Sequence, residues 1–412
     1  MKKIFFTILS IFSILAIILF SSCKEEPTPS LYEIPPAGSA TPVISSLSPS
    51  DQALAGVTQI TITGSNFLTT PEYNRVYFNN VPGTVLSATT TSLVVIPPVV
   101  ISDTVSVRIA TISNTEFSNT IQNYKLKPSV AELYPFDASA KKQEYPHGLC
   151  VDNSETVYFS LRKTALAQGT KMLPNGATEY MDFSVATGNT ESFFKGITFA
   201  SDNNIYAVTG SVKGVYIVVQ GSKAGAFVAS SQGISDIVKD IEFDAIRNIL
   251  WAGGETGIIY RITLDKNVKK FNINGAINAL KVAGNDLFVV SRVDGEYIIW
   301  KMPIISSDSL GLAEEYFNFS TTVDADLNVN DIEISADNDL YVGTNRIGDP
   351  LYVVYPDKSY EVVYPGLISQ GAYALAWGSG TILYMSTLTT DADGAEVNKS
   401  IYAIDLEKLR IN

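Results

Sequence analysis

The chain has 412 residues, of which 46% are hydrophobic and 17% charged, and its formal net charge is −13. This negative balance argues against a nucleic-acid partner, because nucleic-acid binding needs a basic face. A single histidine rules out a His-rich metal cluster, and two cysteines are too few for a disulfide framework. The prominence of Tyr, Phe, Val, Ile, Thr and Ser is typical of β-structure, and the length allows two or more domains.

The N-terminus has the layout of a secretory signal. Lys2 and Lys3 precede an almost unbroken apolar run, Ile4–Phe20, and Ser21-Ser22-Cys23 follows directly. Small residues at this point are typical of a cleavage site, so residues 1–22 are predicted to be a signal peptide. The alternative is a transmembrane helix, for which the run lies at the short limit.

The same stretch resembles a bacterial lipoprotein lipobox, which implies that Cys23 is acylated and becomes the mature N-terminus. Phe20 departs from that pattern, where Leu or another aliphatic residue is usual. Lys24-Glu25-Glu26 resembles the export signal of Bacteroidetes surface lipoproteins, and its alternative is a charged linker start. We therefore expect an outer-membrane lipoprotein on the cell surface of a diderm bacterium. Residues 23–41 form the lipidated cysteine and a flexible stalk rich in Pro, Ser and Glu.

Residues 42–126 carry a compact β-pattern. Apolar and polar residues alternate in 59–64, 75–78, 92–96 and 104–109, and their short length predicts a sandwich of about seven strands. The order of Ile44–Pro49, Gly56, Ile60–Phe67, Val76–Asn80 and Ala88–Pro97 resembles an IPT/TIG domain. The resemblance implies an immunoglobulin-like fold and leaves the function open.

Residues 127–412 contain an internal repeat of two strands joined by an Asp/Asn/Gly turn. The second strand of each repeat carries an aromatic residue, and these aromatics recur every 37 to 53 residues, a period typical of propeller blades. The six segments are 147–160, 195–209, 239–253, 278–291, 330–344 and 373–387. The chain is therefore expected to be all-β, with the sandwich followed by a six-bladed β-propeller.

The last blade lacks room for a fourth strand before residue 412. Residues 129–135 have a strand pattern and precede the first blade, so we predict that they supply the missing strand and remove an open sheet edge. Third strands are predicted at 215–219, 258–262, 297–301, 351–355 and 401–405. Residues 146–160 resemble an NHL repeat, and the other five segments match that pattern more loosely.

Residues that open the inner strands should converge on one mouth of the propeller channel. A concave surface with a few convergent polar groups is the default binding site, although polar strand starts are also common simply because loops are solvated. The predicted ligand-binding face is His147, Lys195, Lys239, Asp240, Asn278, Arg292, Asn330, Asp331, Arg346 and Tyr373. Loops after the second strands add Arg162 and Glu255.

The leading hypothesis is a surface-tethered binding or scaffold protein that captures a glycan or a protein. Tethered sandwich domains ahead of a recognition domain resemble glycan-capture lipoproteins of Bacteroidetes uptake systems. Sugars stack on aromatic faces, and Tyr373 is the only aromatic residue of the six that open the inner strands apart from His147. We expect a monomer or a member of an outer-membrane complex, with no nucleic acid and no required cofactor.

Two alternatives remain open. The first is a metal-dependent propeller hydrolase, lactonase or lyase, in which Asp240 and Asp331 would supply oxygen ligands to Ca²⁺. The inner strand starts lack the glutamate of the lactonase pattern, and His147 has no second histidine with which to build a triad. The second alternative is a purely structural component of the cell envelope.

Overall fold

The structure is a computed structural model that describes residues 38, 40–135, 144–163, 166–172, 178–181, 194–219, 221–387, 389–390, 396–397 and 400–411. The predicted signal peptide, Cys23, the Lys24-Glu25-Glu26 motif and most of the stalk lie outside these residues. Among the described residues, no helix combines the length and hydropathy of a membrane span. The chain divides into two compact units.

The first domain is a sandwich of two sheets. One sheet has the strand order β1-β3-β7-β6 and the other the order β2-β9-β8-β4-β5. The strands are β1 (Val43–Ser48), β2 (Gln52–Leu54), β3 (Ile60–Ser65), β4 (Asn74–Phe78), β5 (Val81–Pro82), β6 (Thr84–Ala88), β7 (Ser92–Ile96), β8 (Ser102–Thr111) and β9 (Ile121–Lys127), with a short 3-10 helix at Pro71–Tyr73.

Its core follows the alternation in the sequence. Ile60 and Ile62 in β3, and Val76 and Phe78 in β4, are fully buried, whereas Thr63 in β3 is exposed. A period of two places successive side chains on opposite faces, so a strand with this pattern buries one face only. The immunoglobulin-like prediction is confirmed.

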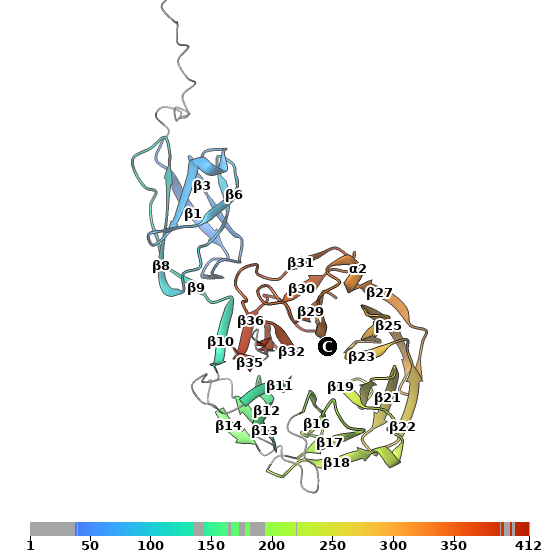
Figure 1. Ribbon diagram of the computed structural model, residues 1–412. Coiled ribbons are helices and arrows are strands. Elements are labelled where there is room, and N and C mark those ends of the chain that lie inside the picture. Colours follow the sequence, from blue (N-terminus) through green and yellow to red (C-terminus); the bar gives the residue numbers. More distant parts are fainter. Residues whose placement is uncertain are drawn as a thin grey trace, which may run out of the picture. The chain divides into compact units, whose positions relative to one another are not determined.

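The second unit is a six-bladed β-propeller, whose sheets surround a common axis (Figure 1). Blade one is β11 (Glu144–Val151), β12 (Val157–Lys163), β13 (Leu166–Met172) and β14 (Thr178–Met181). Blade two is β15 (Gly196–Phe199), β16 (Ile205–Val208), β17 (Gly214–Val218) and β18 (Gly225–Ala229). Blade three is β19 (Val238–Asp244), β20 (Ile249–Gly254), β21 (Ile258–Thr263) and β22 (Val268–Asn272).

The remaining blades follow in chain order. Blade four is β23 (Ala276–Ala283), β24 (Asp286–Val293), β25 (Glu296–Ser306) and β27 (Glu314–Asn318), with β26 (Ser309–Leu310) on the end of β25. A short helix, α2 (Phe319–Thr322), follows it. Blade five is β28 (Val329–Ile334), β29 (Leu340–Thr344), β30 (Leu351–Val354) and β31 (Tyr360–Val362). Blade six contains β32 (Ala372–Trp377), β33 (Ile382–Thr387) and β36 (Ser400–Asp405); a short pair, β34 (Thr389–Thr390) and β35 (Glu396–Val397), lies between the last two.

The sixth blade is closed by the strand that precedes the first blade. β10 (Val130–Pro135) pairs antiparallel with β36, and Ala131 lies opposite Ala403. The prediction for residues 129–135 is confirmed. Because β10 occupies the outer edge of this sheet, the first and last strands of the propeller belong to one blade.

The aromatic residue of each repeat has a structural role. Tyr158 Oη donates to Asp152 Oδ2 at 3.0 Å, and Tyr206 Oη donates to Asp202 Oδ2 at 2.9 Å. In blade three, Trp251 Nε1 donates to a carboxylate oxygen of the same turn at 3.2 Å. A buried hydroxyl or indole N–H needs an acceptor, and the turn aspartate provides one. In blades one, two and three the repeat therefore encodes a buried ring and the acceptor of its polar group.

Candidate functional site

The predicted ring of strand-opening residues coincides with a ring of β-bulges. The pairing between first and second strands shifts register at Lys239, Asn278, Asn330 and Tyr373, and between Pro146 and Leu149 in blade one. A bulge inserts one extra residue and re-aims its side chain. In blade two, Lys195 directly precedes β15 and its N–H donates to Val208 O at 2.8 Å.

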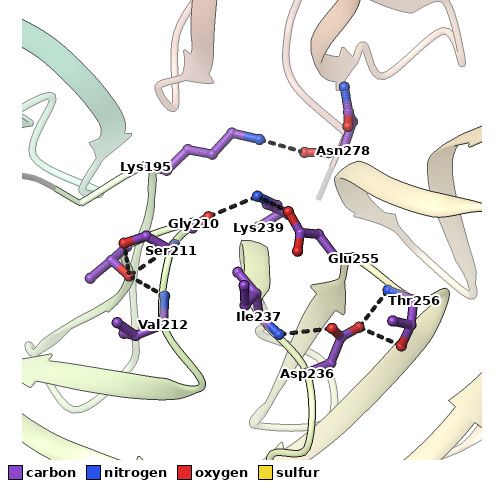
Figure 2. Close-up of polar contacts among 11 residues, drawn as sticks. Lys195, Gly210, Ser211, Val212, Asp236, Ile237, Lys239, Glu255, Thr256 and Asn278 are labelled. Carbon is purple, nitrogen blue, oxygen red and sulfur yellow. Dashed lines mark hydrogen bonds and ion pairs between the residues drawn. The ribbon is translucent and has the colours of Figure 1, made fainter.

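Two lysines of this ring are held by oxygen acceptors (Figure 2). Lys239 Nζ donates to Gly210 O at 2.8 Å and forms an ion pair with Glu255, which follows β20. Lys195 Nζ reaches toward blade four and donates to Asn278 O at 3.4 Å. Burial lowers the pKa of Lys195, although the charge of Asp240 opposes this effect.

Asn278 and Asn330 tie neighbouring blades together. Asn278 Nδ2 donates to Val329 O at 3.0 Å, and Asn330 Nδ2 donates to Ala372 O at 2.8 Å. In both cases the acceptor belongs to the residue just before the bulge or at the start of the next inner strand. These two amide groups therefore serve the packing of blades four, five and six.

His147 and Tyr373 form an aromatic pair between blades one and six. Their ring centroids lie 5.0 Å apart at an interplanar angle of 76°, an edge-to-face arrangement. His147 is only 3% exposed, whereas Tyr373 is partly exposed. Of the two, Tyr373 is the side chain that offers surface to a ligand.

The two predicted arginines are exposed and interact within their own blades. Arg292 Nε donates to Gly295 O at 3.4 Å, and its guanidinium lies 5.6 Å from the centre of the Tyr297 ring. Arg346 Nη1 donates to Tyr352 Oη at 2.6 Å. The side chain of Arg162 lies outside the described residues.

A cavity of about 250 Å³ lies on the propeller axis, and all six inner strands contribute to its lining. We call it the axial cavity. Of the ten predicted residues it is lined by Lys195, Asp240 and Asp331, and the other seven are not part of its lining. The lining continues to Ser201 and Ala245, which are exposed residues of turns between first and second strands. The axial cavity therefore extends from the ring toward the opposite end of the propeller.

Both aspartates of the axial cavity accept hydrogen bonds from the next blade. Leu280 N donates to Asp240 Oδ2 at 2.9 Å, and Leu375 N donates to Asp331 Oδ2 at 2.7 Å. Burial raises the pKa of Asp240. Burial and then the charge of Asp240 raise the pKa of Asp331 well above its usual range. A Cβ atom on Gly196 would lie 2.7 Å from Asp240 Oδ1, so only glycine allows this carboxylate its position.

Four further charged residues line the axial cavity, and none of them was predicted from the sequence. They are Glu242, Lys281, Glu333 and Arg410. Lys281 Nζ lies 3.1 Å from Glu242 Oε1 and 2.7 Å from Glu333 Oε1. Burial disfavours the charged form of Lys281, but the two carboxylates outweigh burial and raise its pKa.

A periodic signal for three of them exists in the sequence. Glu242, Lys281 and Glu333 each lie three residues after a ring residue, and in β23 Lys281 interrupts a strand that is otherwise mostly apolar. Arg410 has no such signal because it follows the last blade. Its Nη2 lies 3.6 Å from Glu242 Oε1 and its Nη1 donates to Trp377 O at 3.3 Å. A bridge between Ser335 and Arg410 holds this C-terminal segment against blade five.

Only two of the described residues that were proposed as calcium ligands, Asp240 and Asp331, line the axial cavity. Within the described residues, no three side chains of His, Cys, Asp or Glu gather in a way that could hold a metal ion. Asp240 and Asp331 remain the two candidates, and each already accepts a backbone N–H.

Comparisons with known proteins place the two units separately. Residues 42–125 match the IPT/TIG domain, which agrees with the sandwich described above. A search of the curated proteins found no match to this sequence.

Similar solved structures share the propeller architecture at low identity. A putative gluconolactonase is 13% identical with a TM-score of 0.51, over 69% of this chain and 93% of that one. An auxiliary nutrient binding protein from Bacteroides thetaiotaomicron is 13% identical with a TM-score of 0.47, over 88% and 98% of the two chains. Virginiamycin B lyase from Staphylococcus aureus is 13% identical with a TM-score of 0.46, over 74% and 93%. Identities this low speak for the fold alone.

Proposed function

We propose that this chain is a binding protein of the bacterial cell envelope, anchored by a lipid on Cys23, whose propeller captures a glycan at the ring of strand-opening residues. The observation that carries the proposal is the bulge ring. Five of six inner strands bulge at the same position, and bulges are over-represented where a protein re-aims side chains for function.

The ring offers chemistry suited to a sugar. Tyr373 is partly exposed and is held edge-to-face by His147, so a sugar face can stack on an ordered ring. On blade three of the same ring, Lys239 and Glu255 form an ion pair, with Glu255 exposed to solvent. Charged donors and acceptors of this kind hydrogen-bond sugar hydroxyls. A protein ligand could contact the same groups. The experiment below distinguishes a glycan ligand from a protein ligand.

The test is a glycan array probed with residues 24–412, which omit the signal peptide and the acylated cysteine. We expect binding that Tyr373→Ala abolishes and that Tyr360→Ala leaves intact, because Tyr360 is an exposed tyrosine of blade five outside the ring. If no glycan binds, the sugar hypothesis is wrong. A pull-down from intact envelope with the same two variants then separates a protein ligand from a purely structural role.

The anchor is tested independently of the ligand. Labelling cells with a palmitate analogue should mark the wild-type chain and leave Cys23→Ala unlabelled. Surface exposure predicts that added protease digests the chain on intact cells. Replacing Lys24-Glu25-Glu26 with alanines should protect the chain if these residues direct export, and unchanged digestion would remove them from that role.

An enzymatic function is supported by one feature, the buried pair Asp240 and Asp331. Burial raises the pKa of both carboxyl groups, and the charge of Asp240 further raises the pKa of Asp331; raised pKa values of this kind are typical of acid–base sites. Hydrolysis of small lactones by the wild-type chain, lost in Asp331→Asn and kept in Tyr373→Ala, would favour this alternative over capture.

A further inference from the structure

Three consecutive blades place their charged residues in two layers along the axial cavity. The residue after each ring position is Asp240 in β19, Ala279 in β23 and Asp331 in β28. We call these three the upper layer. Two residues further along the same strands lie Glu242, Lys281 and Glu333, the lower layer. Because side chains alternate along a strand, the two members from each strand lie on the same side.

The lower layer is a complete site for a primary ammonium group. Lys281 Nζ is held between Glu242 Oε1 at 3.1 Å and Glu333 Oε1 at 2.7 Å. The two carboxylates come from blades three and five, and the ammonium comes from blade four between them. This cavity therefore already binds one ammonium group with carboxylates from two blades.

The upper layer repeats the carboxylates without the cation. Ala279 carries only a methyl group at the position that corresponds to Lys281. Among the described residues, neither Asp240 nor Asp331 has an ion-pair partner within 4.0 Å, and each accepts only backbone N–H groups. Lys195, a ring lysine that also lines the axial cavity, directs its Nζ to Asn278 O (Figure 2). Lys195 and Lys281 act on Asp240 only from beyond ion-pair distance, so a donor that contacts both carboxylates directly would lower the cost of burying them.

A second observation points to a missing donor in the same cavity. Glu333 is 1% exposed and lines the axial cavity, and its Oε2 has no hydrogen-bond partner among the described residues. Buried polar atoms are nearly always paired, so this oxygen calls for a donor from outside the chain. A cavity of about 250 Å³ has room for a small organic molecule.

We propose that the axial cavity binds a small primary amine in its ammonium form, with Asp240 and Asp331 accepting from the ammonium group and Glu333 Oε2 accepting from another donor of the ligand. When all four carboxyl groups of the lining are ionised, its three cationic side chains leave one negative charge, which one ammonium group balances. In the lower layer, carboxylates from blades three and five hold the ammonium group of Lys281, so the same spacing suits a primary ammonium ion. The site is separate from Tyr373 and from the glycan proposed at the ring.

The experiment is isothermal titration calorimetry of residues 24–412 with ethylammonium chloride as the probe. Tetramethylammonium chloride supplies the same charge without N–H donors, and calcium chloride supplies a metal ion. The variants are Asp240→Asn and Asp331→Asn, which keep side-chain shape and remove charge. Asp265→Asn, at an exposed turn of blade three, is the matched control.

We expect ethylammonium to bind the wild-type chain and Asp265→Asn equally. Each cavity variant should weaken binding by about tenfold or more, as loss of a charge-assisted hydrogen bond predicts. Tetramethylammonium should not compete. Absence of ethylammonium binding, equal binding of tetramethylammonium, or displacement of ethylammonium by Ca²⁺ would each overturn the proposal, and these comparisons need only the wild-type chain. Tyr373→Ala should leave ethylammonium binding unchanged, which separates this proposal from capture at the ring.

Discussion

Lys281 Nζ lies 2.7 Å from Glu333 Oε1 on the axis of the propeller, where both side chains are almost completely shielded from water. With Glu242 on the other side of the ammonium, three blades meet in one buried ion network. Such networks contribute little net stability when complete but are expensive to break, because the remaining charge stays buried without a partner.

The first prediction concerns this network. Lys281→Met should destabilise the propeller by about 3–5 kcal/mol, because Glu333 would be left buried without its cation and Glu242 would keep only Arg410. Urea unfolding at pH 7 measures the change. Adding Glu333→Gln to Lys281→Met should recover part of the loss. Equal stability of the single and double variants would contradict a cost from an unpaired charge on Glu333 in Lys281→Met.

The second prediction concerns pH. The pKa of Asp331 in the folded chain is raised above its usual value of 3.8 by burial and by Asp240, so folding favours its protonated form. Its contribution to stability is full below the unfolded pKa and is lost as pH rises through the folded pKa. Asp331→Asn should therefore stabilise the chain at neutral pH and flatten the rise of stability on acidification.

Urea unfolding of the wild-type chain and Asp331→Asn between pH 4 and pH 8 (roughly the window above the unfolded pKa) tests this. The other charged groups facing this carboxyl are Asp240, Lys195, Lys281 and Glu333, and they are the same in both chains. Identical slopes of stability against pH in the two chains would contradict the expected contribution of Asp331.

The third prediction separates the two roles open to Asn330. Its amide donates to Ala372 O across the blade boundary, so Asn330→Ala should destabilise the chain by about 1 kcal/mol, the usual contribution of such a hydrogen bond. The exposed Asn272→Ala in β22 should have almost no effect. If Asn330→Ala keeps the thermal midpoint of the wild-type chain but no longer binds the ligand, Asn330 belongs to the binding face instead.

The fourth prediction uses the closing strand. Ala131 and Ala403 are direct partners in the antiparallel pair of β10 and β36, so a cysteine at each position is suitably placed for a disulfide. Oxidation of the double variant should stabilise the propeller by about 2–4 kcal/mol. Urea midpoints with and without reductant measure the difference. Failure to form the disulfide would argue against this register.

The fold was largely predictable because each repeat contains chemically distinctive residues at fixed positions. The turn aspartate and the aromatic residue in positions such as Asp202 and Tyr206 identify blades even at low similarity, and the strand pattern of β10 reveals the closure. The third strand of blade one, Leu166–Met172, was unclear because Gln168, Gly169, Thr170 and Lys171 replace the apolar residues seen in the other blades.

The site was predictable only in part. The alignment of repeats locates the bulge ring, since each bulge falls at the same place in its strand. The alignment does not show that the side chains of Asn278 and Asn330 donate hydrogen bonds to the next blade. Their acceptors are backbone oxygens, which a sequence pattern does not identify. Nor does it show Arg410 on the axis, since that contact depends on where the chain runs after its last repeat.

The pairing of β10 with β36 ties the folding of the propeller to the order in which the chain is made. β10 is synthesised before any complete blade, and its partner strand comes after all the others. Until β36 is available, β10 has an unpaired edge of the kind that invites pairing with other chains. A chain released early would therefore lack more than its last strand. It would expose edges at both ends of an open ring, and each edge could pair with another chain.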